Sequence, residues 1–187
     1  MALEHAILVS LAEKSASGYD LARRFDASIG HFWKASHQQI YKVLGRMQAD
    51  GWVASELIAQ DGRPDKKVYV ITVRGREELT LWTSKATPVE HLRSEFAVKL
   101  RALPFGDSDA IIDDVRVRRR AHAEQLAYYV DSAAKFYPRP DDLTDDEIGG
   151  WLVLRGGILA EQTGITWCDE ILRSLPGQVS QRLGDER

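Results

Sequence analysis

The 187-residue sequence contains a single cysteine, Cys168, and no long apolar run. One cysteine excludes an intrachain disulfide and any metal site built from several cysteines. No apolar stretch approaches the roughly 20 residues that a membrane-spanning helix needs, and the N-terminal Met-Ala-Leu-Glu-His lacks the basic segment of a secretory signal. We therefore expect a cytoplasmic protein without a membrane partner.

The sequence also lacks the patterns of common catalytic sites. Its five histidines are scattered and form no His-x-x-x-His pair, which argues against a zinc hydrolase. Cys168 falls within a predicted helix, a position typical of a packed or exposed thiol and not of a nucleophile. The glycine pairs near the C-terminus lie inside a predicted helix, so they form no phosphate-binding loop. We expect no catalytic residues, no metal and no cofactor.

Charge is distributed unevenly along the chain, whose net charge is −3. Residues 1–86 contain 12 Lys and Arg against 10 Asp and Glu, a net charge of +2. Residues 87–187 contain 13 against 18, a net charge of −5. A slightly basic half followed by an acidic half suits a nucleic-acid reader joined to a body that does not touch nucleic acid.

Residues 36–51 predict an amphipathic helix with a defined start and end. Ser36 suits the N-cap, and Gly51 suits the left-handed residue that ends a helix. The buried stripe consists of apolar residues three and four apart: Ile40, Val43, Leu44 and Met47. The opposite face contains long donors and small residues but no carboxylate: Gln38, Lys42, Gly45, Arg46 and Ala49. Alone, this stretch is also typical of an ordinary surface helix.

The flanking segments predict a winged helix-turn-helix. Residues 3–13 form a helix that is apolar on nearly every side, and a second helix starts at 17–20 and ends within 26–30. The short connector 31–35 then leads into the helix of residues 36–51, which is the helix-turn-helix plan. Residues 52–58 and 67–71 predict two strands around a turn, and a further helix spans 73–85. Gly75 in that helix indicates a close backbone contact, and Pro88 ends the unit.

Five separated motifs occur in order: Gly18-Tyr19-Asp20-Leu21, Gln39-Ile40-Tyr41-Lys42-Val43-Leu44-Gly45-Arg46-Met47, Asp50-Gly51-Trp52-Val53, Tyr69-Val70-Ile71-Thr72, and Gly75. With them, residues 3–85 resemble the PadR family of winged-helix transcriptional regulators. The C-terminal helices resemble the subgroup that is similar to virulence-activator proteins. The resemblance implies a homodimer that binds a palindromic operator in double-stranded DNA, usually as a repressor, and often releases it on binding an aromatic or hydrophobic small molecule. The connector Lys34-Ala35-Ser36 lacks the proline that is frequent in the family, so the approach angle of the next helix is less constrained.

The predicted DNA contacts divide by chemistry. Gln38, Gln39 and Lys42 are expected to enter the major groove, because amides pair with adenine and cations with guanine. Phosphates are expected to contact Tyr41, Arg46 and the cationic residues of the hairpin, and Gly45 should allow close approach. The full predicted DNA-binding set is His37, Gln38, Gln39, Tyr41, Lys42, Gly45, Arg46, Arg63, Lys66 and Lys67.

Residues 87–187 predict three helices with apolar seams. The first seam is Val89, Leu92, Phe96, Leu100 and Leu103, and the second is Ile112, Val115, Arg119, His122, Leu126, Tyr129, Ala133 and Phe136. The third, in a helix from Asp145 to Leu175, is Ile148, Trp151, Arg155, Ile158, Gln162, Ile165, Asp169 and Leu172. A second copy of the chain would cover these seams and place two recognition helices about 34–36 Å apart on DNA. One option is that Arg119 or Arg155 pairs with Asp169 across that interface.

Glycines recur at roughly heptad spacing in the last helix: Gly149-Gly150, Gly156-Gly157 and Gly164. They favour close helix packing, with room for a partner helix or a ligand as the alternative. An aromatic-lined effector pocket is a further hypothesis, with Trp33, Phe96, Trp151 and Trp167 as its candidate residues.

The predicted fold is mostly α-helical and has two domains. Residues 1–86 form a winged helix-turn-helix domain of three helices, a two-stranded wing and a following helix. Residues 87–187 form an α-helical dimerisation domain that could also bind an effector. The predicted function is a sequence-specific DNA-binding transcriptional regulator. The alternative, suggested by the nearly neutral N-terminal half, is a winged-helix protein-interaction module without specific DNA binding.

Overall fold

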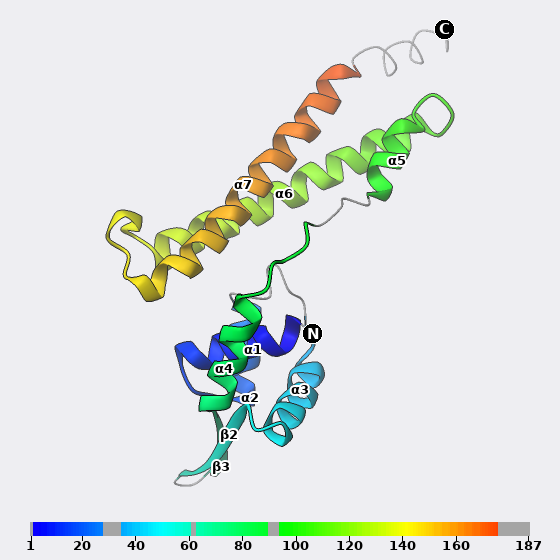
Figure 1. The fold of residues 1–187 in the computed structure, drawn as a ribbon. Helices are drawn as coiled ribbons and strands as arrows, with labels where there is room; N and C mark the ends of the chain where they lie inside the picture. The colour runs from blue at the N-terminus through cyan, green and yellow to red at the C-terminus, as the bar shows by residue number, and fades with distance from the viewer. Residues whose placement is uncertain (1, 28–34, 61–62, 90–93, 176–187) are drawn as a thin grey trace, which may run out of the picture. The chain divides into compact units, whose positions relative to one another are not determined.

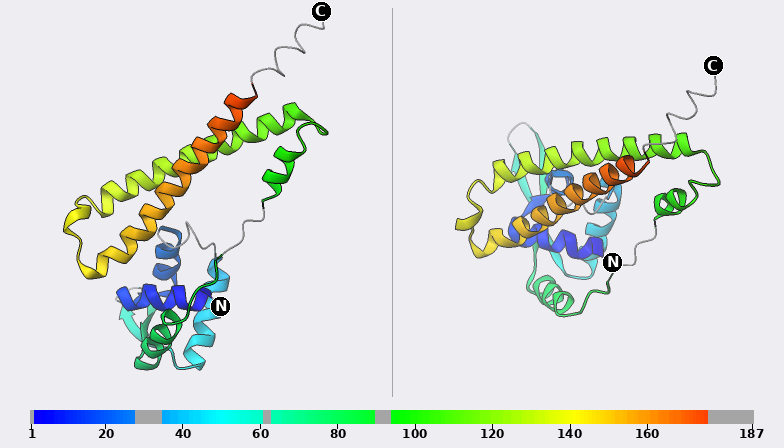
Figure 2. Two further views of the ribbon diagram at one scale, coloured as in Figure 1. Left: turned by 45° about the horizontal axis from the view of Figure 1, so that its top comes forward. Right: turned by 90° about the horizontal axis from the view of Figure 1, so that it is seen from above.

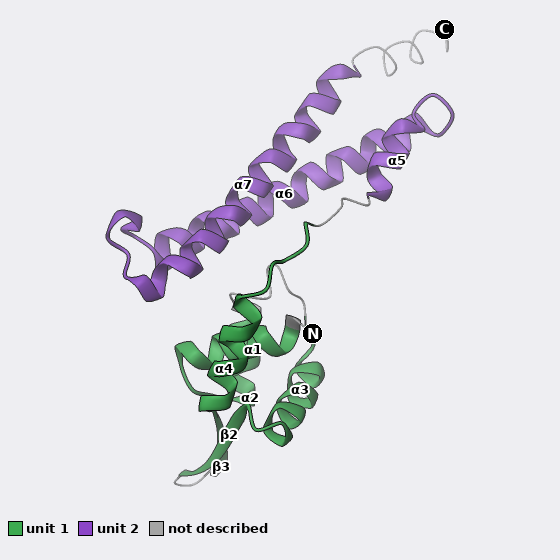
Figure 3. Ribbon diagram, viewed as in Figure 1, with its two compact units in different colours: residues 1–90 green, residues 91–187 purple. Residues whose placement is uncertain are grey.

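The computed structural model describes residues 2–27, 35–60, 63–89 and 94–175, and the chain divides into two units, Met1–Glu90 and His91–Arg187 (Figures 1 and 3). The elements of unit 1 are α1 (Ala2–Glu13), β1 (Ala16–Ser17), α2 (Gly18–Ala27), α3 (His37–Ala49), β2 (Val53–Gln60), β3 (Arg63–Ile71) and α4 (Val73–Thr83). Those of unit 2 are α5 (Glu95–Arg101), α6 (Ser108–Phe136), a short 3-10 helix (Pro140–Asp142) and α7 (Asp145–Ser174). The mostly α-helical winged fold is therefore confirmed.

Helix α1 is the centre of unit 1. It contacts α2, α3, β3 and α4, which explains why its sequence is apolar on nearly every side. Side chains from α1, α2, α3, β2 and β3 form the buried core: Ile7, Leu8, Leu11, Leu21, Phe25, Ile40, Leu44, Met47, Val53 and Tyr69. Leu79 of α4 is partly buried and packs against it. Neighbouring elements of the same unit therefore account for most of this apolar surface.

The sheet has three antiparallel strands in the order β1-β3-β2. Strands β2 and β3 form the predicted hairpin and extend nearer to its tip than the alternation indicated. The two-residue strand β1 pairs Ser17 with Val68, and this third strand was missed because two residues show no alternation. Its pairing fixes the start of α2 beside the wing.

Two glycines in unit 1 have the backbone roles expected of them. Gly51 follows α3 with φ of 74°, in the left-handed region that ends helices. An ideal Cβ on Gly75 would lie 2.2 Å from the carbonyl oxygen of Trp52, so the predicted close backbone contact is confirmed. Thr72 caps α4 by accepting the Gly75 N–H at 3.0 Å.

Unit 2 consists mainly of the two long helices α6 and α7, which lie side by side along their length (Figure 2). The predicted helix over 89–103 is shorter than expected. Val89 is 86% exposed and outside any helix, Leu92 lies outside the described residues, and α5 begins after the Ser94 cap. The Ser94 hydroxyl accepts the Ala97 N–H at 3.1 Å, which satisfies a donor of the first turn.

The seam of α7 was partly misassigned. Arg155 and Gln162 are exposed, whereas Leu154, Glu161 and Cys168 lie on the covered side. The covered positions are still spaced alternately by three and four residues, but after Trp151 the step of three comes first and the step of four second. They are Trp151, Leu154, Ile158, Glu161, Ile165, Cys168 and Leu172. Both orders fit the heptad, so spacing alone could not choose between them.

Three glycines of α7 face α6 or Tyr137, the residue that follows α6, and allow these to approach closely. An added Cβ would lie 2.3 Å from the Tyr137 hydroxyl at Gly150, 3.0 Å from the Tyr129 ring at Gly157, and 2.8 Å from the His122 ring at Gly164. The close-packing interpretation is confirmed for these positions. At Gly149 and Gly156, by contrast, an added Cβ meets no atom within 4 Å.

Polar residues in the α6–α7 seam pair within the chain. The Arg119 guanidinium donates to both carboxylate oxygens of Asp169, at 2.5 and 3.2 Å. His122 Nδ1 lies 2.5 Å from a carboxylate oxygen of Glu161. The structure thus pairs Arg119 with Asp169 within one chain, where the sequence suggested a pair across a dimer interface.

Candidate nucleic-acid interface

Helix α3 begins with a reciprocal cap. The Ser36 hydroxyl accepts the Gln39 N–H at 3.2 Å, and the Gln39 side-chain oxygen accepts the Ser36 N–H at 2.9 Å. This capping box satisfies two donors that would otherwise be unpaired. Gln39, predicted as a base reader, therefore helps to hold the start of α3. The Ser-x-x-Gln spacing at the start of α3 is the sequence pattern of a capping box, so this role of Gln39 could have been predicted.

The outward face of α3 presents the remaining predicted base readers. Ile40, Leu44 and Met47 are fully buried, so the helix is fixed in rotation and Gln38 and Lys42 point outward. Within the described ranges, neither Gln38 nor Lys42 has a polar partner. His37, in the first turn, is also exposed. The face can therefore offer amide and ammonium donors to a ligand at no cost to the folded domain.

Gly45 lies on this outward face without a structural reason inside the domain. It is exposed, and an added Cβ would meet nothing within 4 Å. A glycine in a helix interior costs about 1 kcal/mol relative to alanine. No described neighbour in the domain occupies the space of a Cβ at this position, so the glycine leaves this face open to close approach from outside.

Tyr41 connects α3 to the start of α2. Its ring edge lies against Gly18, where an added Cβ would come within 2.3 Å of Tyr41 Cε1. The residue nevertheless remains 48% exposed. Gly18 in the first motif is thus explained by the position of Tyr41 in the second.

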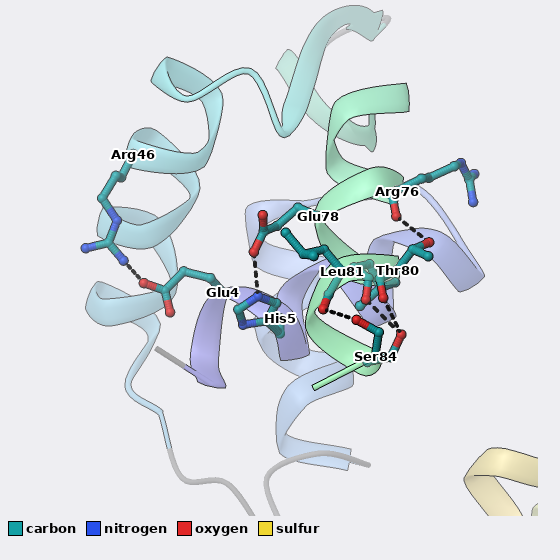
Figure 4. A network of polar contacts seen from close by, with 10 residues as sticks. Glu4, His5, Arg46, Arg76, Glu78, Thr80, Leu81 and Ser84 are labelled. Carbon is teal, nitrogen blue, oxygen red and sulfur yellow. Dashed lines mark hydrogen bonds and ion pairs between the residues drawn. The ribbon is translucent and has the colours of Figure 1, made fainter. Parts of the chain in front are cut away.

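Arg46 and two residues of α1 form a polar network across unit 1 (Figure 4). The Arg46 guanidinium, 57% exposed, donates to the buried carboxylate of Glu4. The neighbouring His5 stacks on Trp82 of α4, with ring centroids 4.5 Å apart, and its Nε2 lies 3.2 Å from Glu78. Consecutive residues of α1 therefore join the candidate recognition helix to α4.

The wing contains two lysines that the structure shows in contact with the helices. Lys66 Nζ lies 2.7 Å from a carboxylate oxygen of Asp20, and Lys67 Nζ donates to the side-chain oxygen of Gln48 at 3.1 Å. The backbone of Arg63 pairs with Gln60 at the tip of the hairpin. Sequence reasoning placed these cations on the wing correctly but did not anticipate their partners within the protein.

The predicted effector residues that the structure describes do not meet in one pocket. Trp33 lies outside the described residues. Phe96 and Trp167 make an edge-on contact at 5.4 Å, whereas Trp151 contacts Tyr137 at 5.8 Å. Trp151 and Trp167 are 16 positions apart on one helix, or about 24 Å. An open groove beside Trp167 is lined by His122, Leu159, Ala160, Thr163 and Gly164.

Two negative findings hold for the described residues. No group of three or more His, Cys, Asp or Glu side chains there could hold a metal ion. In the same ranges, no helix is both long and apolar enough to cross a membrane.

Two family descriptions match the chain. Residues 7–81 match the transcriptional regulator PadR-like family, and residues 92–175 match the virulence activator alpha C-terminal family. The first covers the helix-turn-helix and wing, and the second covers α5, α6 and α7.

Similar proteins cover nearly the full length. A probable transcriptional regulator of Mycobacterium tuberculosis is 43% identical over 185 residues, covering 94% of this chain and 98% of the relative. The virulence activator AphA of Vibrio cholerae is 34% identical with a TM-score of 0.78, covering 92% and 97% of the two chains. PadR of Bacillus subtilis, solved with operator DNA, is 26% identical with a TM-score of 0.83, covering 93% and 98%. The same PadR has also been solved with p-coumaric acid, at 25% identity, a TM-score of 0.74 and coverage of 91% and 93%.

Proposed function

This chain belongs to the PadR-like family of transcriptional regulators, and we propose that it binds a palindromic operator as a homodimeric repressor. The observation that carries the proposal is the outward face of α3. It has amide and ammonium donors without a polar partner among the described residues, no carboxylate, and a glycine with open space where a Cβ would be. A polyanion approaching closely explains all three features.

In this proposal α3 lies in the major groove. Gln38 donates to and accepts from an adenine edge, and Lys42 donates to guanine. Gly45 lets the helix axis come close to the DNA, and Tyr41 holds a phosphate with its hydroxyl. The similarity to Bacillus subtilis PadR, which was solved with operator DNA, supports this arrangement.

The dimer is proposed to form through the outer face of α7. Large apolar side chains remain exposed there, namely Leu152, Val153, Leu159 and Trp167, at 40–61% of their surface. Gly149 and Gly156 share this stretch and have open space where a Cβ would be, so a partner helix could approach closely. A two-fold dimer would also present two copies of α3 to a palindromic site.

Two similar proteins support the proposal that this chain represses transcription and releases its operator when an effector binds. Bacillus subtilis PadR is named a negative transcriptional regulator, and its structure with p-coumaric acid supports an aromatic effector. In this chain Trp167, which is 40% exposed and lines the open groove with His122 and Leu159, is the aromatic side chain proposed to meet such a ligand. Titrating the protein with phenolic acids should quench tryptophan fluorescence, and no quenching by any of them would remove the effector from the proposal.

A gel shift with duplex DNA from the region upstream of the protein's own gene tests the proposed function. Specific binding should survive excess unrelated duplex. The logarithm of affinity should fall linearly with the logarithm of salt concentration, by about 0.9 per phosphate neutralised. A missing or salt-independent shift would instead favour the winged-helix protein-interaction module. A reporter gene under the same upstream region should be repressed by the wild-type protein.

A further inference from the structure

The two lysines of the wing each reach a different helix of the helix-turn-helix. Successive residues of a strand point to opposite faces, so adjacent Lys66 and Lys67 leave β3 on opposite sides. Lys66 Nζ lies 2.7 Å from Asp20 at the start of α2, and Lys67 Nζ lies 3.1 Å from the Gln48 side-chain oxygen near the end of α3. The wing is therefore tied to both helices.

The Lys66 contact belongs to a local structure. Strand β1 pairs Ser17 with Val68, two positions from Lys66 on the same face of β3. The Ser17 hydroxyl donates to the Asp20 carboxylate at 2.9 Å and accepts the Asp20 N–H at 3.1 Å. Hydrogen bonds from Lys66 and from Ser17 lower the pKa of Asp20 below its usual value, so this carboxylate is ionised at neutral pH. A fixed anion thus holds the ammonium of Lys66.

Lys67 makes a second contact, with an aromatic ring of the unit 1 core. Lys67 Nζ lies 5.0 Å from the centre of the Tyr69 ring, and Tyr69 is a buried member of the unit 1 core. A cation over an aromatic ring is attracted by the ring's electron density. The exposed side chain of Lys67 therefore contacts both Tyr69 of the core and Gln48 of α3.

We propose that Lys66 and Lys67 are positioning residues, which fix the wing relative to α2 and α3 and are not phosphate contacts themselves. The proposal rests on the proposed DNA binding and changes the role that the sequence suggested for these two cations. The orientation of the wing relative to α2 and α3 is then fixed before DNA binds. The affinity of the protein for DNA therefore depends on Asp20 as well as on Lys66.

Substituting Asp20 distinguishes a positioning role of Lys66 from a phosphate contact, because the two roles predict opposite changes in DNA affinity. If Lys66 contacts a phosphate, Asp20 competes for its charge, and Asp20→Asn should raise DNA affinity. If Lys66 positions the wing through Asp20, the same substitution should lower affinity, although it removes a negative charge near DNA. Partly exposed ion pairs are weak, so we expect a loss of about two- to fivefold.

The experiment measures DNA affinity as a function of salt for the full-length wild type, Lys66→Met, Asp20→Asn and the double variant, with the upstream duplex as probe. Positioning predicts similar losses in the two single variants, no further loss in the double variant, and an unchanged salt slope. Lys42→Met is the matched control, because this lysine has no polar partner in the described ranges and its charge is proposed to lie on DNA. Its loss should flatten the slope by up to about 0.9. Thermal melting of each variant checks that it folds.

Hydrogen exchange of the β2 and β3 amides, measured without DNA, gives a second readout. Positioning predicts faster exchange of these amides in both single variants than in the wild type. The proposal is overturned if Lys66→Met flattens the salt slope by about 0.9, if Asp20→Asn keeps or raises affinity, or if exchange of the wing is unchanged. Failure of the wild type to bind DNA, with exchange changed as predicted, would instead refute the proposed function.

Discussion

Replacing Gly45 by alanine should change stability and DNA affinity in opposite directions. In the free protein an added Cβ meets no heavy atom within 4 Å, so the substitution introduces no clash. Alanine is favoured over glycine in a helix interior by about 1 kcal/mol, and the free energy of unfolding should rise by that amount. The midpoint of thermal unfolding should increase by about 2–8 °C.

On DNA the same methyl group occupies the space needed for close approach. Overpacking of a tight contact costs about 1–3 kcal/mol, which corresponds to a five- to 150-fold loss of affinity. Thermal melting by circular dichroism and fluorescence anisotropy with labelled operator measure the two effects on one preparation. Ala127→Gly, at an exposed position of α6, serves as control, with stability lowered by about 1 kcal/mol and affinity unchanged. A Gly45→Ala protein that binds operator as tightly as wild type would refute close approach at this position.

Three further predictions concern the rest of the chain. Gly75→Ala should destabilise unit 1 by about 1–3 kcal/mol in urea unfolding, because its Cβ would lie 2.2 Å from the Trp52 carbonyl oxygen; an unchanged midpoint would contradict that contact. Arg119 lowers the pKa of Asp169 below 3.8, so the ion pair stabilises the fold above that pH and is lost as pH falls through the lowered value. Asp169→Asn should therefore be less stable than wild type at neutral pH and equally stable at the acid end, and a difference independent of pH would contradict this. Leu159→Asp, on the exposed face of α7, should halve the mass measured by light scattering, whereas a mass equal to that of wild type would exclude this face as the dimer interface.

The helices and their caps could be predicted because their signals are local. Ser36 and Gly51 each act within one turn of their own position, and the structure confirms both. The contact at Gly75 was also predicted, since a glycine in a first helical turn is unfavourable unless something lies close to it.

The remaining features depend on partners distant in sequence. The strand β1 has two residues and exists only because β3 is beside it. The Lys66 contact with Asp20 and the Arg46 contact with Glu4 join residues more than 40 positions apart, and no spacing rule connects them. The prediction of the α7 seam was partly wrong for a different reason. Two sets of positions, both spaced alternately by three and four, fitted the sequence, and only the packing of α6 distinguishes them.

The central claim is that the outward face of α3 reads base sequence, and Gln38→Ala tests it most directly. Wild type and variant would each select bound duplexes from a random pool, and the selected sequences would be compared position by position. We predict that the variant loses preference at one position in each half-site, by about 1–3 kcal/mol, while the other positions keep theirs. An unchanged set of preferences at every position would contradict the assignment of Gln38 as a base reader.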